Sequence, residues 1–320
     1  MKKLVVAAAA VAGLAFGVPA MAQTKPTIAV IVKDTTLPFW QAVLAGARQA
    51  GQDLGADISE LGAQSESDAK SQIDLLARAV ASNPAAIVIA PAQFAALGKP
   101  IDEAAKKTKI IGIESAADTK AMTTLLATDN VKAGRLAADA LAAAITRTYG
   151  DTEGNIAVIA SQDGLASLDQ RAKGFKETLA TKYRALAIVA DTVADGKPTS
   201  VLGMMKNIIA NTADLRGVFG SDLLAMQAVG QAVAESKSGD KINVVGVGAD
   251  EKLIKFLQDD AIAGLVVEDP FRMGYDGVKT ALAASKGEQV SANVDTGATL
   301  VTKANMSSPR SQELLKPKVE

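Results

Sequence analysis

The chain has 320 residues, of which 34 are basic and 35 acidic, so its formal net charge at pH 7 is −1. It contains neither Cys nor His, which excludes disulfides, His-based catalytic triads and the commonest protein metal ligand. No basic stripe and no polybasic segment is present, so neither nucleic acid nor a lipid surface is an expected partner. An ordinary hydrophobic core must hold the fold together, and a chain of this length can bury one.

Residues 1–22 have the pattern of a cleavable signal peptide. Lys2 and Lys3 form a basic start, residues 4–18 are apolar, and Ala20-Met21-Ala22 supplies small residues at the cleavage position. The apolar stretch is shorter than the roughly 20 residues that a membrane-spanning helix needs. There is no Cys for lipid attachment. We therefore expect cleavage between Ala22 and Gln23, and export of a soluble protein to the periplasm.

Beyond this segment, short apolar runs alternate with amphipathic stretches whose apolar residues recur with helical spacing. The apolar runs predict strands at 26–32, 86–90, 110–113, 123–127, 156–160, 187–190, 217–220, 242–247, 263–267 and 298–302. The amphipathic stretches predict helices at 38–54, 68–81, 131–146, 168–180, 199–210, 223–235, 252–257 and 271–285, with one more helix between the second and third strands.

This alternation is typical of an α/β fold whose parallel sheets are covered by helices on both faces. The rhythm restarts after residue 127, which divides the chain into two halves of similar size. The join at Ala127-Thr128-Asp129-Asn130 passes from strand to helix without a Ser/Gly-rich linker. We therefore predict two Rossmann-like lobes joined by strands that cross between them, with a ligand cleft between the lobes.

Motifs of cofactor-dependent and metal-dependent enzymes are missing from the sequence. Gly246-Val247-Gly248-Ala249 resembles the start of a dinucleotide fingerprint, but Glu251 stands where the third Gly belongs. There is no P-loop, H-E-x-x-H, G-x-S-x-G or EF-hand loop, so no cofactor and no metal are expected. Paired carboxylates could still serve a secreted glycosidase or lyase, and that enzyme class stays open as an alternative.

Ligands of open α/β sheets bind outside the carboxyl ends of the strands, so residues that follow the predicted strands are the first candidates for a site. These positions are rich in acids and amides, and aromatic residues gather beside them. Rings pack on the C–H faces of sugars and carboxylates accept hydroxyl protons, so the composition favours a polyhydroxylated ligand. The candidates of this type are Lys33, Phe39, Trp40, Gln93, Phe94, Glu114, Ser115, Ser221, Asp222 and Glu268.

Several candidates also have an ordinary structural interpretation. Ser221 and Asp222 precede a predicted helix and could cap it. Lys33 could be a solvated strand end, and Glu268 could serve only the connection between the lobes. Arg171 is interpreted as support for the fold and not as a ligand contact.

Seven segments together resemble the periplasmic pentose- and hexose-binding proteins of the ribose-binding type. The segments are IAVIVKDTTLPFW at 28–40, AIVIAPAQ at 86–93, IIGIES at 110–115, TDNVKAGRLAAD at 128–139, RAKGF at 171–175, VFGSD at 218–222 and VVGVGAD at 244–250. The resemblance implies a type I periplasmic binding fold with three crossover strands. It places one lobe at 24–128 plus 269–295 and the other at 129–268 plus 296–320. It also implies a membrane permease with a cytoplasmic ATPase, together an ABC importer, as partner of a monomer.

The candidate site departs from that of the plain sugar binders. Where the family usually has an Asp-Arg pair after the fourth strand, this chain has Glu114-Ser115. The family's arginine at the start of the helix in the second lobe corresponds to Asp169, its aspartate in the V-G-F-D segment to Gly248, and its glutamine at the crossover to Glu268. Two recognition arginines are therefore replaced, and the site is more acidic.

A neighbouring subfamily, the receptors for a furanosyl autoinducer, matches some of these changes. Lys33, Glu114, Asp169 and Gln170 resemble its binding set, so Asp169 and Gln170 join the ligand-binding candidates. Ser221 and Leu223 do not match it.

The sequence thus predicts a receptor that closes on a small sugar or sugar-like ligand by a hinge motion and delivers it to a permease. Candidate ligands are a pentose, a deoxy or branched sugar, a polyol, or an amino sugar whose ammonium would suit the extra acids. An autoinducer receptor and a chemotaxis receptor are alternatives. No catalytic residue is predicted.

Overall fold

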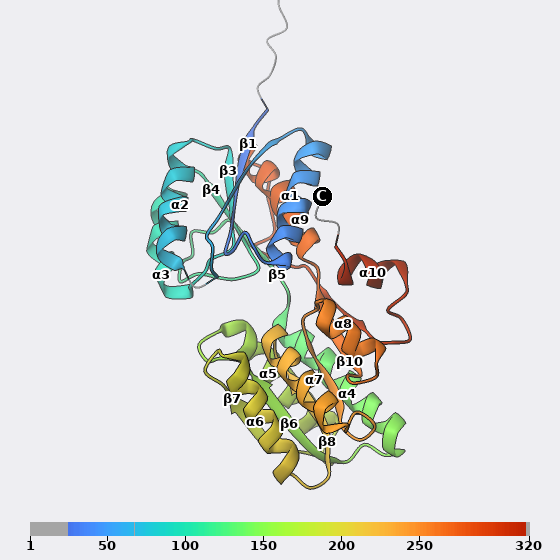
Figure 1. The fold of residues 1–320 in the computed structure, drawn as a ribbon. Helices are drawn as coiled ribbons and strands as arrows, with labels where there is room; N and C mark the ends of the chain where they lie inside the picture. The colour runs from blue at the N-terminus through green and yellow to red at the C-terminus, as the bar shows by residue number, and fades with distance from the viewer. Residues whose placement is uncertain (1–24, 67, 318–320) are drawn as a thin grey trace, which may run out of the picture.

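A computed structural model describes residues 25–66 and 68–317, and the predicted signal peptide lies outside them. The described chain forms two six-stranded sheets, which define a first and a second lobe (Figure 1). The sheet of the first lobe has the order β11-β5-β4-β3-β1-β2, and all its neighbouring strands are parallel. Its strands are β1 (Thr27–Val32), β2 (Asp57–Gly62), β3 (Ala86–Ile89), β4 (Lys109–Ile113), β5 (Thr124–Ala127) and β11 (Asn293–Asp295).

The sheet of the second lobe has the order β12-β10-β9-β8-β6-β7. Its strands are parallel except for the edge strand β12, which pairs antiparallel with β10. They are β6 (Gly154–Ala160), β7 (Leu186–Val193), β8 (Leu215–Gly220), β9 (Asn243–Val247), β10 (Gly264–Glu268) and β12 (Ala298–Val301). Two sheets of mostly parallel strands confirm the prediction of two Rossmann-like lobes.

Helices cover both faces of each sheet. The first lobe has α1 (Pro38–Leu54) and α9 (Pro270–Ser285) on one face, with α2 (Ala69–Ala81) and α3 (Phe94–Ala105) on the other. The second lobe has α4 (Asn130–Tyr149) and α5 (Ala166–Lys182) on one face, and α6 (Pro198–Asn211), α7 (Leu223–Ser236), α8 (Glu251–Gln258) and α10 (Pro309–Leu315) on the other. Burial on both faces explains why central strands such as β3 (AIVI) are continuous apolar runs with every residue buried.

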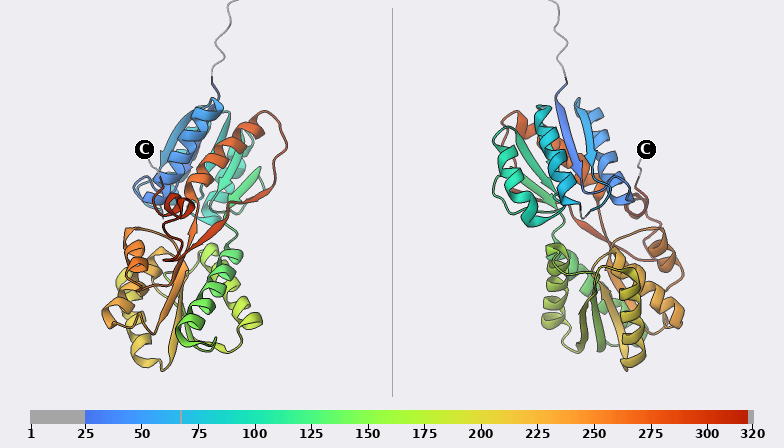
Figure 2. Two further views of the ribbon diagram at one scale, coloured as in Figure 1. Left: turned by 90° about the vertical axis from the view of Figure 1, so that its right-hand side faces the viewer. Right: turned by 60° about the vertical axis from the view of Figure 1, so that its left-hand side comes forward.

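The two best-packed helix pairs approach each other closely through glycines. A β-carbon on Gly46 of α1 would lie 1.9 Å from the carbonyl oxygen of Phe271, and one on Gly274 of α9 would lie 1.9 Å from that of Val43. In the second lobe, Gly134 of α4 and Gly174 of α5 are in the same situation, with 2.0 Å to a carbonyl oxygen of the partner helix. The side-by-side path of α1 and α9 is visible in the left view of Figure 2.

The chain passes between the lobes three times. It leaves the first sheet after β5 and enters α4, returns after β10 to begin α9, and crosses again between β11 and β12. Two of these crossings lie side by side, because the Thr296 amide donates to the Ala127 carbonyl and Asp295 accepts from the Asp129 amide. Helix α10 lies beside the second connection, where Arg310 pairs at 2.5 Å with Asp269, the residue between β10 and α9 (Figure 1).

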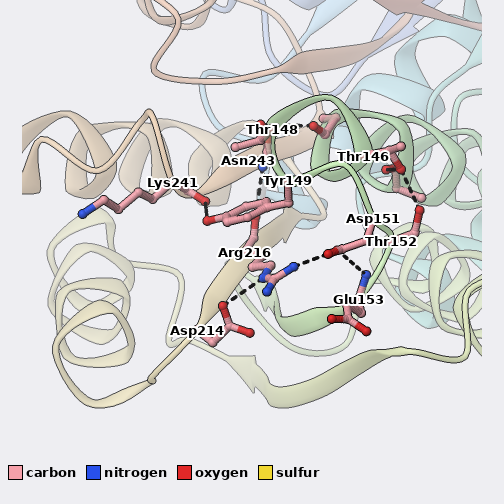
Figure 3. Close-up of polar contacts among 12 residues, drawn as sticks. Thr146, Thr148, Tyr149, Asp151, Thr152, Glu153, Asp214, Arg216, Lys241 and Asn243 are labelled. Atoms are coloured by element: carbon pink, nitrogen blue, oxygen red, sulfur yellow. Dashed lines mark hydrogen bonds and ion pairs between the residues drawn. The ribbon is translucent and has the colours of Figure 1, made fainter.

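A polar cluster around Arg216 stabilises the second lobe at the end where its strands begin (Figure 3). Its guanidinium lies 4.3 Å from the ring centre of Tyr149 and pairs with Asp214 and Asp151, each at 2.8 Å. The Tyr149 hydroxyl donates to the carbonyl oxygen of Lys241 at 2.7 Å. The cluster therefore joins the end of α4 to the loops before β6, β8 and β9.

Three described elements were not predicted: β2, β11 and α10. None of the helices among the described residues is both long enough and apolar enough to span a membrane.

Candidate ligand-binding site

The carboxyl ends of β1 and β4 bring three candidate residues into one hydrogen-bonded group. The Lys33 ammonium follows β1 and lies 2.5 Å from Glu114 Oε2 and 2.6 Å from Ser115 Oγ. The Ser115 hydroxyl also donates to the Glu114 carboxylate. Glu114 has φ 62°, a left-handed conformation that is uncommon outside glycine and worth notice at a binding site. The two charged side chains are only 14% and 17% exposed, so little water screens them.

The surroundings of Glu114 favour its charged form. Burial alone would raise the pKa of this carboxyl, but the charge of Lys33, the hydrogen bonds from Lys33 and Ser115, and the charge of Arg171 together hold the pKa below its usual value. Arg171 belongs to the second lobe, so an electrostatic interaction already connects the two lobes at the candidate site.

Trp40 lies in the core at the start of α1, and a ligand contact by its ring stays a prediction. Its side chain is 1% exposed, and the indole Nε1 donates to Glu66 at 2.7 Å. The ring lies beneath Lys33, whose ammonium is 5.5 Å from the ring centre, and meets the half-buried Phe39 edge to face at 4.9 Å. Helix α1 begins at Pro38, so its first turn directs Trp40 into the core between α1 and the sheet. Trp40 therefore supports the Lys33 side of the site from below.

Gln93 and Phe94 lie at the start of α3 and are exposed, Phe94 by 55%. The backbone before them is held by Gln72, which was not among the candidates. Gln72 of α2 is fully buried, and its amide donates to the carbonyl oxygen of Ala90 at 2.8 Å and accepts from the Ala92 amide at 2.8 Å. The side-chain oxygen and nitrogen of Gln72 each have a backbone partner, so Gln72 fixes the backbone between the end of β3 and Gln93.

In the second lobe the candidates gather around Arg171 of α5, which is 5% exposed. Its Nη2 pairs with Glu268 Oε1 at 3.0 Å, its Nε donates to Asn130 Oδ1 at 2.7 Å, and its Nη1 donates to the Ser221 carbonyl at 3.2 Å. Glu268 ends β10, so the acid that replaces the family's glutamine has a cation beside it. Arg171 was interpreted as support for the fold. Its contacts with Asn130, Ser221 and Glu268 were not predicted, because these residues come from other parts of the chain.

Ser221 and Asp222 serve the start of α7. One Asp222 oxygen accepts from the Ala225 amide at 3.0 Å, and the other accepts from the Ser161 amide at 3.0 Å. Ser221 is fully buried, and its hydroxyl donates to Asp222 at 3.2 Å. Asp222 is therefore the N-cap of α7, as its capping interpretation expects, whereas Ser221 supports the Asp222 carboxylate and does not itself cap the helix. A ligand contact by either stays a prediction.

Asp169 and Gln170 lie in the first turns of α5 and are exposed. Residues one or two positions apart on a helix point in different directions, so these exposed side chains do not follow the buried Arg171, and a ligand contact by either stays a prediction. Across residues 25–66 and 68–317, no group of three or more acidic side chains is arranged to hold a metal ion. A hollow on the outer edge of the first lobe is lined by Gly62, Gln64, Asp68, Ser71 and Arg78, among others, and includes none of the ligand-binding candidates.

Comparison with known proteins identifies the family of this chain. Residues 28–289 match the family model for the periplasmic binding protein domain. The chain belongs to the periplasmic binding protein family. Within that family it is a type I protein of the ribose-binding type, because a ribose import binding protein from Haemophilus influenzae is 26% identical over 92% of this chain and 97% of its own length.

Two solved structures of periplasmic binding proteins are especially similar. A carbohydrate transporter solute-binding protein from Agrobacterium radiobacter, in complex with D-arabinose, is 55% identical with a TM-score of 0.84 and covers 92% of this chain and all of its own. An ABC transporter solute-binding protein from Agrobacterium vitis, with bound D-fucose, is 31% identical with a TM-score of 0.78, and the match covers 90% and 99% of the two chains. These relatives are binding proteins of transport systems and not enzymes, so the comparisons do not support the glycosidase or lyase alternative.

Proposed function

We propose that this protein binds a neutral monosaccharide, with an aldopentose such as D-arabinose as first candidate, and delivers it to an ABC permease in the inner membrane. Sugar binding within the ABC transporter family is the common property of its relatives. The similarity to a D-arabinose complex at 55% identity supports the pentose.

Two acids of the candidate site are already paired with cations, which supports the choice of a neutral ligand. The acid at the end of β4 is paired with Lys33, and the acid at the end of β10 is paired with Arg171. Each ion pair fixes its carboxylate, leaves acceptor capacity for hydroxyl groups, and contributes no net charge. An amino sugar would have to compete with the protein's own cations for these acids, so the paired arrangement argues against it.

Binding would couple the two lobes. Lys33 and Glu114 belong to the first lobe, whereas Arg171, Glu268 and Asp169 belong to the second. A ligand that contacts both groups favours a closed arrangement by its differential affinity for that state. The three crossings between the lobes provide the hinge, and the permease would recognise the closed surface in the periplasm.

A binding panel tests this function. D-arabinose, L-arabinose, D-ribose, D-fucose, glucosamine and the furanosyl autoinducer are each added to the purified protein, and the melting temperature is recorded. A ligand at 100 times its dissociation constant stabilises the folded state by about 2.7 kcal/mol. We expect a neutral pentose to give the largest rise. A rise with glucosamine alone, or with the autoinducer alone, would contradict the proposal.

Delivery needs its own experiment. A strain that lacks this gene should lose growth on the bound sugar at low concentration and regain it with the wild-type gene. Normal uptake accompanied by loss of movement toward the sugar would instead identify a chemotaxis receptor.

A further inference from the structure

Asp269 is the one residue between β10 of the second lobe and α9 of the first lobe, so it forms the second connection. The pairing of β10 with β12 ends one residue earlier, at Glu268 and Ala298. Helix α9 begins one residue later, at Pro270. Asp269 is therefore the point at which the chain passes from one lobe to the other, and it is buried there.

The two carboxylate oxygens of Asp269 bind to different lobes. Oδ1 accepts from the Arg272 amide at 3.0 Å and so caps α9, which packs in the first-lobe core. Oδ2 pairs with Arg310 Nη2 at 2.5 Å. Arg310 lies in the first turn of α10, a helix that packs in the second-lobe core through the buried Leu314 and Leu315. One side chain thus joins a helix of the first lobe to a helix of the second.

The position of Arg310 is unfavourable for α10 considered alone. The N-terminal end of a helix carries a partial positive charge, so a cation in the first turn is not stabilised there. The contact of Arg310 with Glu313 one turn along the helix is 3.5 Å long and exposed, and such pairs contribute little. Asp269, in contrast, is an acid at the N-cap of α9, where negative charge is favoured. The pairing with Asp269 is therefore the interaction that accounts for an arginine at this position.

We propose that α10 acts as a strap across the second connection: through Arg310 it holds Asp269 and the start of α9, and it restricts rotation of the first lobe relative to the second. Figure 1 and both views of Figure 2 show α10 beside the boundary between the lobes. Rotation about the connections moves the start of α9 relative to α10 and stretches the ion pair. The first and third connections are joined separately, by the hydrogen bond from the Thr296 amide to the Ala127 carbonyl, so the strap restrains a different part of the hinge.

Substitutions can remove the ion pair without removing the cap of α9. R310M eliminates the cation and keeps an apolar stem of similar length. D269N eliminates the negative charge, but asparagine still offers an oxygen to the Arg272 amide and is a good N-cap. R310K keeps a cation, and lysine can serve here because a single guanidinium nitrogen contacts Asp269. E313Q removes the contact within α10 and is the matched control.

Distance measurement between spin labels provides the readout. The chain has no Cys, so Lys99→Cys on α3 of the first lobe and Ala180→Cys on α5 of the second, both exposed, accept one label each. The distance distribution is recorded for the full protein without ligand, in the labelled wild type, the four single variants and R310M/D269N. The result therefore does not depend on which sugar the protein binds.

We expect a broader interlobe distribution in R310M, in D269N and in the double variant, and to the same extent in all three, because each lacks the same ion pair. R310K and E313Q should retain the wild-type distribution. The melting temperature of R310M should fall by no more than about 4 °C, since the arginine is half-exposed, so a broader distribution would not reflect unfolding. A wild-type distribution in R310M would overturn the proposal. So would a double variant that is broader than either single variant, because the two residues would then act independently.

Discussion

The Lys33 ammonium lies 2.5 Å from the Glu114 carboxylate, although 81 residues separate them in the chain. The two residues directly follow β1 and β4, which are not neighbours, since β3 lies between them in the sheet. The long Lys33 side chain therefore reaches across the end of β3, with the buried Trp40 ring beneath it. The first predictions concern this ion pair and the Trp40 ring that lies beneath Lys33.

Substitution of Lys33 by Met should change how stability depends on pH. In the wild type the pKa of Glu114 is below its ordinary 4.5, so its contribution to stability is full above pH 4.5 and is lost as the pH falls through the lower folded value. Without Lys33, burial dominates and raises the pKa. We expect K33M to lose about 2–4 kcal/mol near pH 7 and progressively less toward pH 4, measured by denaturant unfolding.

The exposed pair of Lys70 and Asp74 on α2 provides the control for this experiment. It is an i,i+4 pair at 3.3 Å, with side chains 89% and 66% exposed, so K70M should have almost no effect. A loss in K33M that is the same at pH 4 and pH 7 would contradict the assigned role of Lys33.

Trp40 is the single tryptophan of the chain, and its burial makes a spectroscopic prediction. Its fluorescence should resist quenching by acrylamide with or without sugar, because the indole is covered by the first-lobe core. W40F should lower the free energy of unfolding by about 1–3 kcal/mol through lost packing and the lost hydrogen bond to Glu66. Strong quenching in the ligand-free protein would show that the ring faces solvent.

Two crossings contain buried threonine hydroxyls that lack a hydrogen-bond partner among the described residues, Thr128 and Thr296. Valine has nearly the same shape and no hydroxyl, so T296V should leave stability unchanged or raise it by about 1 kcal/mol. Thr124 is equally buried, but its hydroxyl donates to the Ser291 carbonyl, so T124V should destabilise. Equal losses in the two variants, measured by thermal unfolding, would refute this distinction.

The close approach of α1 and α9 predicts a strong effect of one methyl group. G274A should destabilise the first lobe by about 2 kcal/mol or more, because its β-carbon would lie 1.9 Å from the Val43 carbonyl and force the helices apart. A β-carbon added to Gly203 in α6 would meet only open space, so G203A should be neutral or stabilising through helix propensity. Calorimetry of the two variants makes this comparison directly.

The Arg216 cluster should affect stability without affecting the ligand. The cluster lies at the starts of the second-lobe strands (Figure 3). The site candidates follow the ends of the strands, so the length of the sheet separates the two. R216M loses two ion pairs and the Tyr149 contact, and its melting temperature should fall measurably. Its dissociation constant for the identified sugar should equal that of the wild type. A changed affinity would reveal coupling along the lobe.

Much of the fold was predictable because buried strands and amphipathic helices have strong periodic patterns. The predictions of β3 and α1, for example, agree with the structure to within one residue. Strand β2 was missed because it is an edge strand whose sequence, DISELG, is half exposed and lacks an apolar run. Strand β11 has only three residues and pairs on one side, so its sequence has too little hydrophobic pattern to be detected.

The candidate site was predictable in outline and not in its contacts. The rule that ligands meet strand ends identified Lys33, Glu114 and Glu268, because topology alone places those residues. Lys33 and Arg171 approach Glu114 and Glu268 only in the folded chain. The sequence therefore did not reveal that these two acids are paired with cations, and the site was interpreted as more acidic. The depth of Trp40 likewise depends on where α1 begins relative to the sheet, which no local pattern records.

The third connection has a consequence for how the molecule is made. The edge strands β11 and β12 both come from the segment that begins at Asn293, so each sheet receives one strand from the end of the chain. A nascent polypeptide that has not yet reached this segment contains two incomplete sheets, each with an open edge beside β5 or β10. Neither half can finish assembling ahead of the other, and synthesis of both lobes is completed almost together.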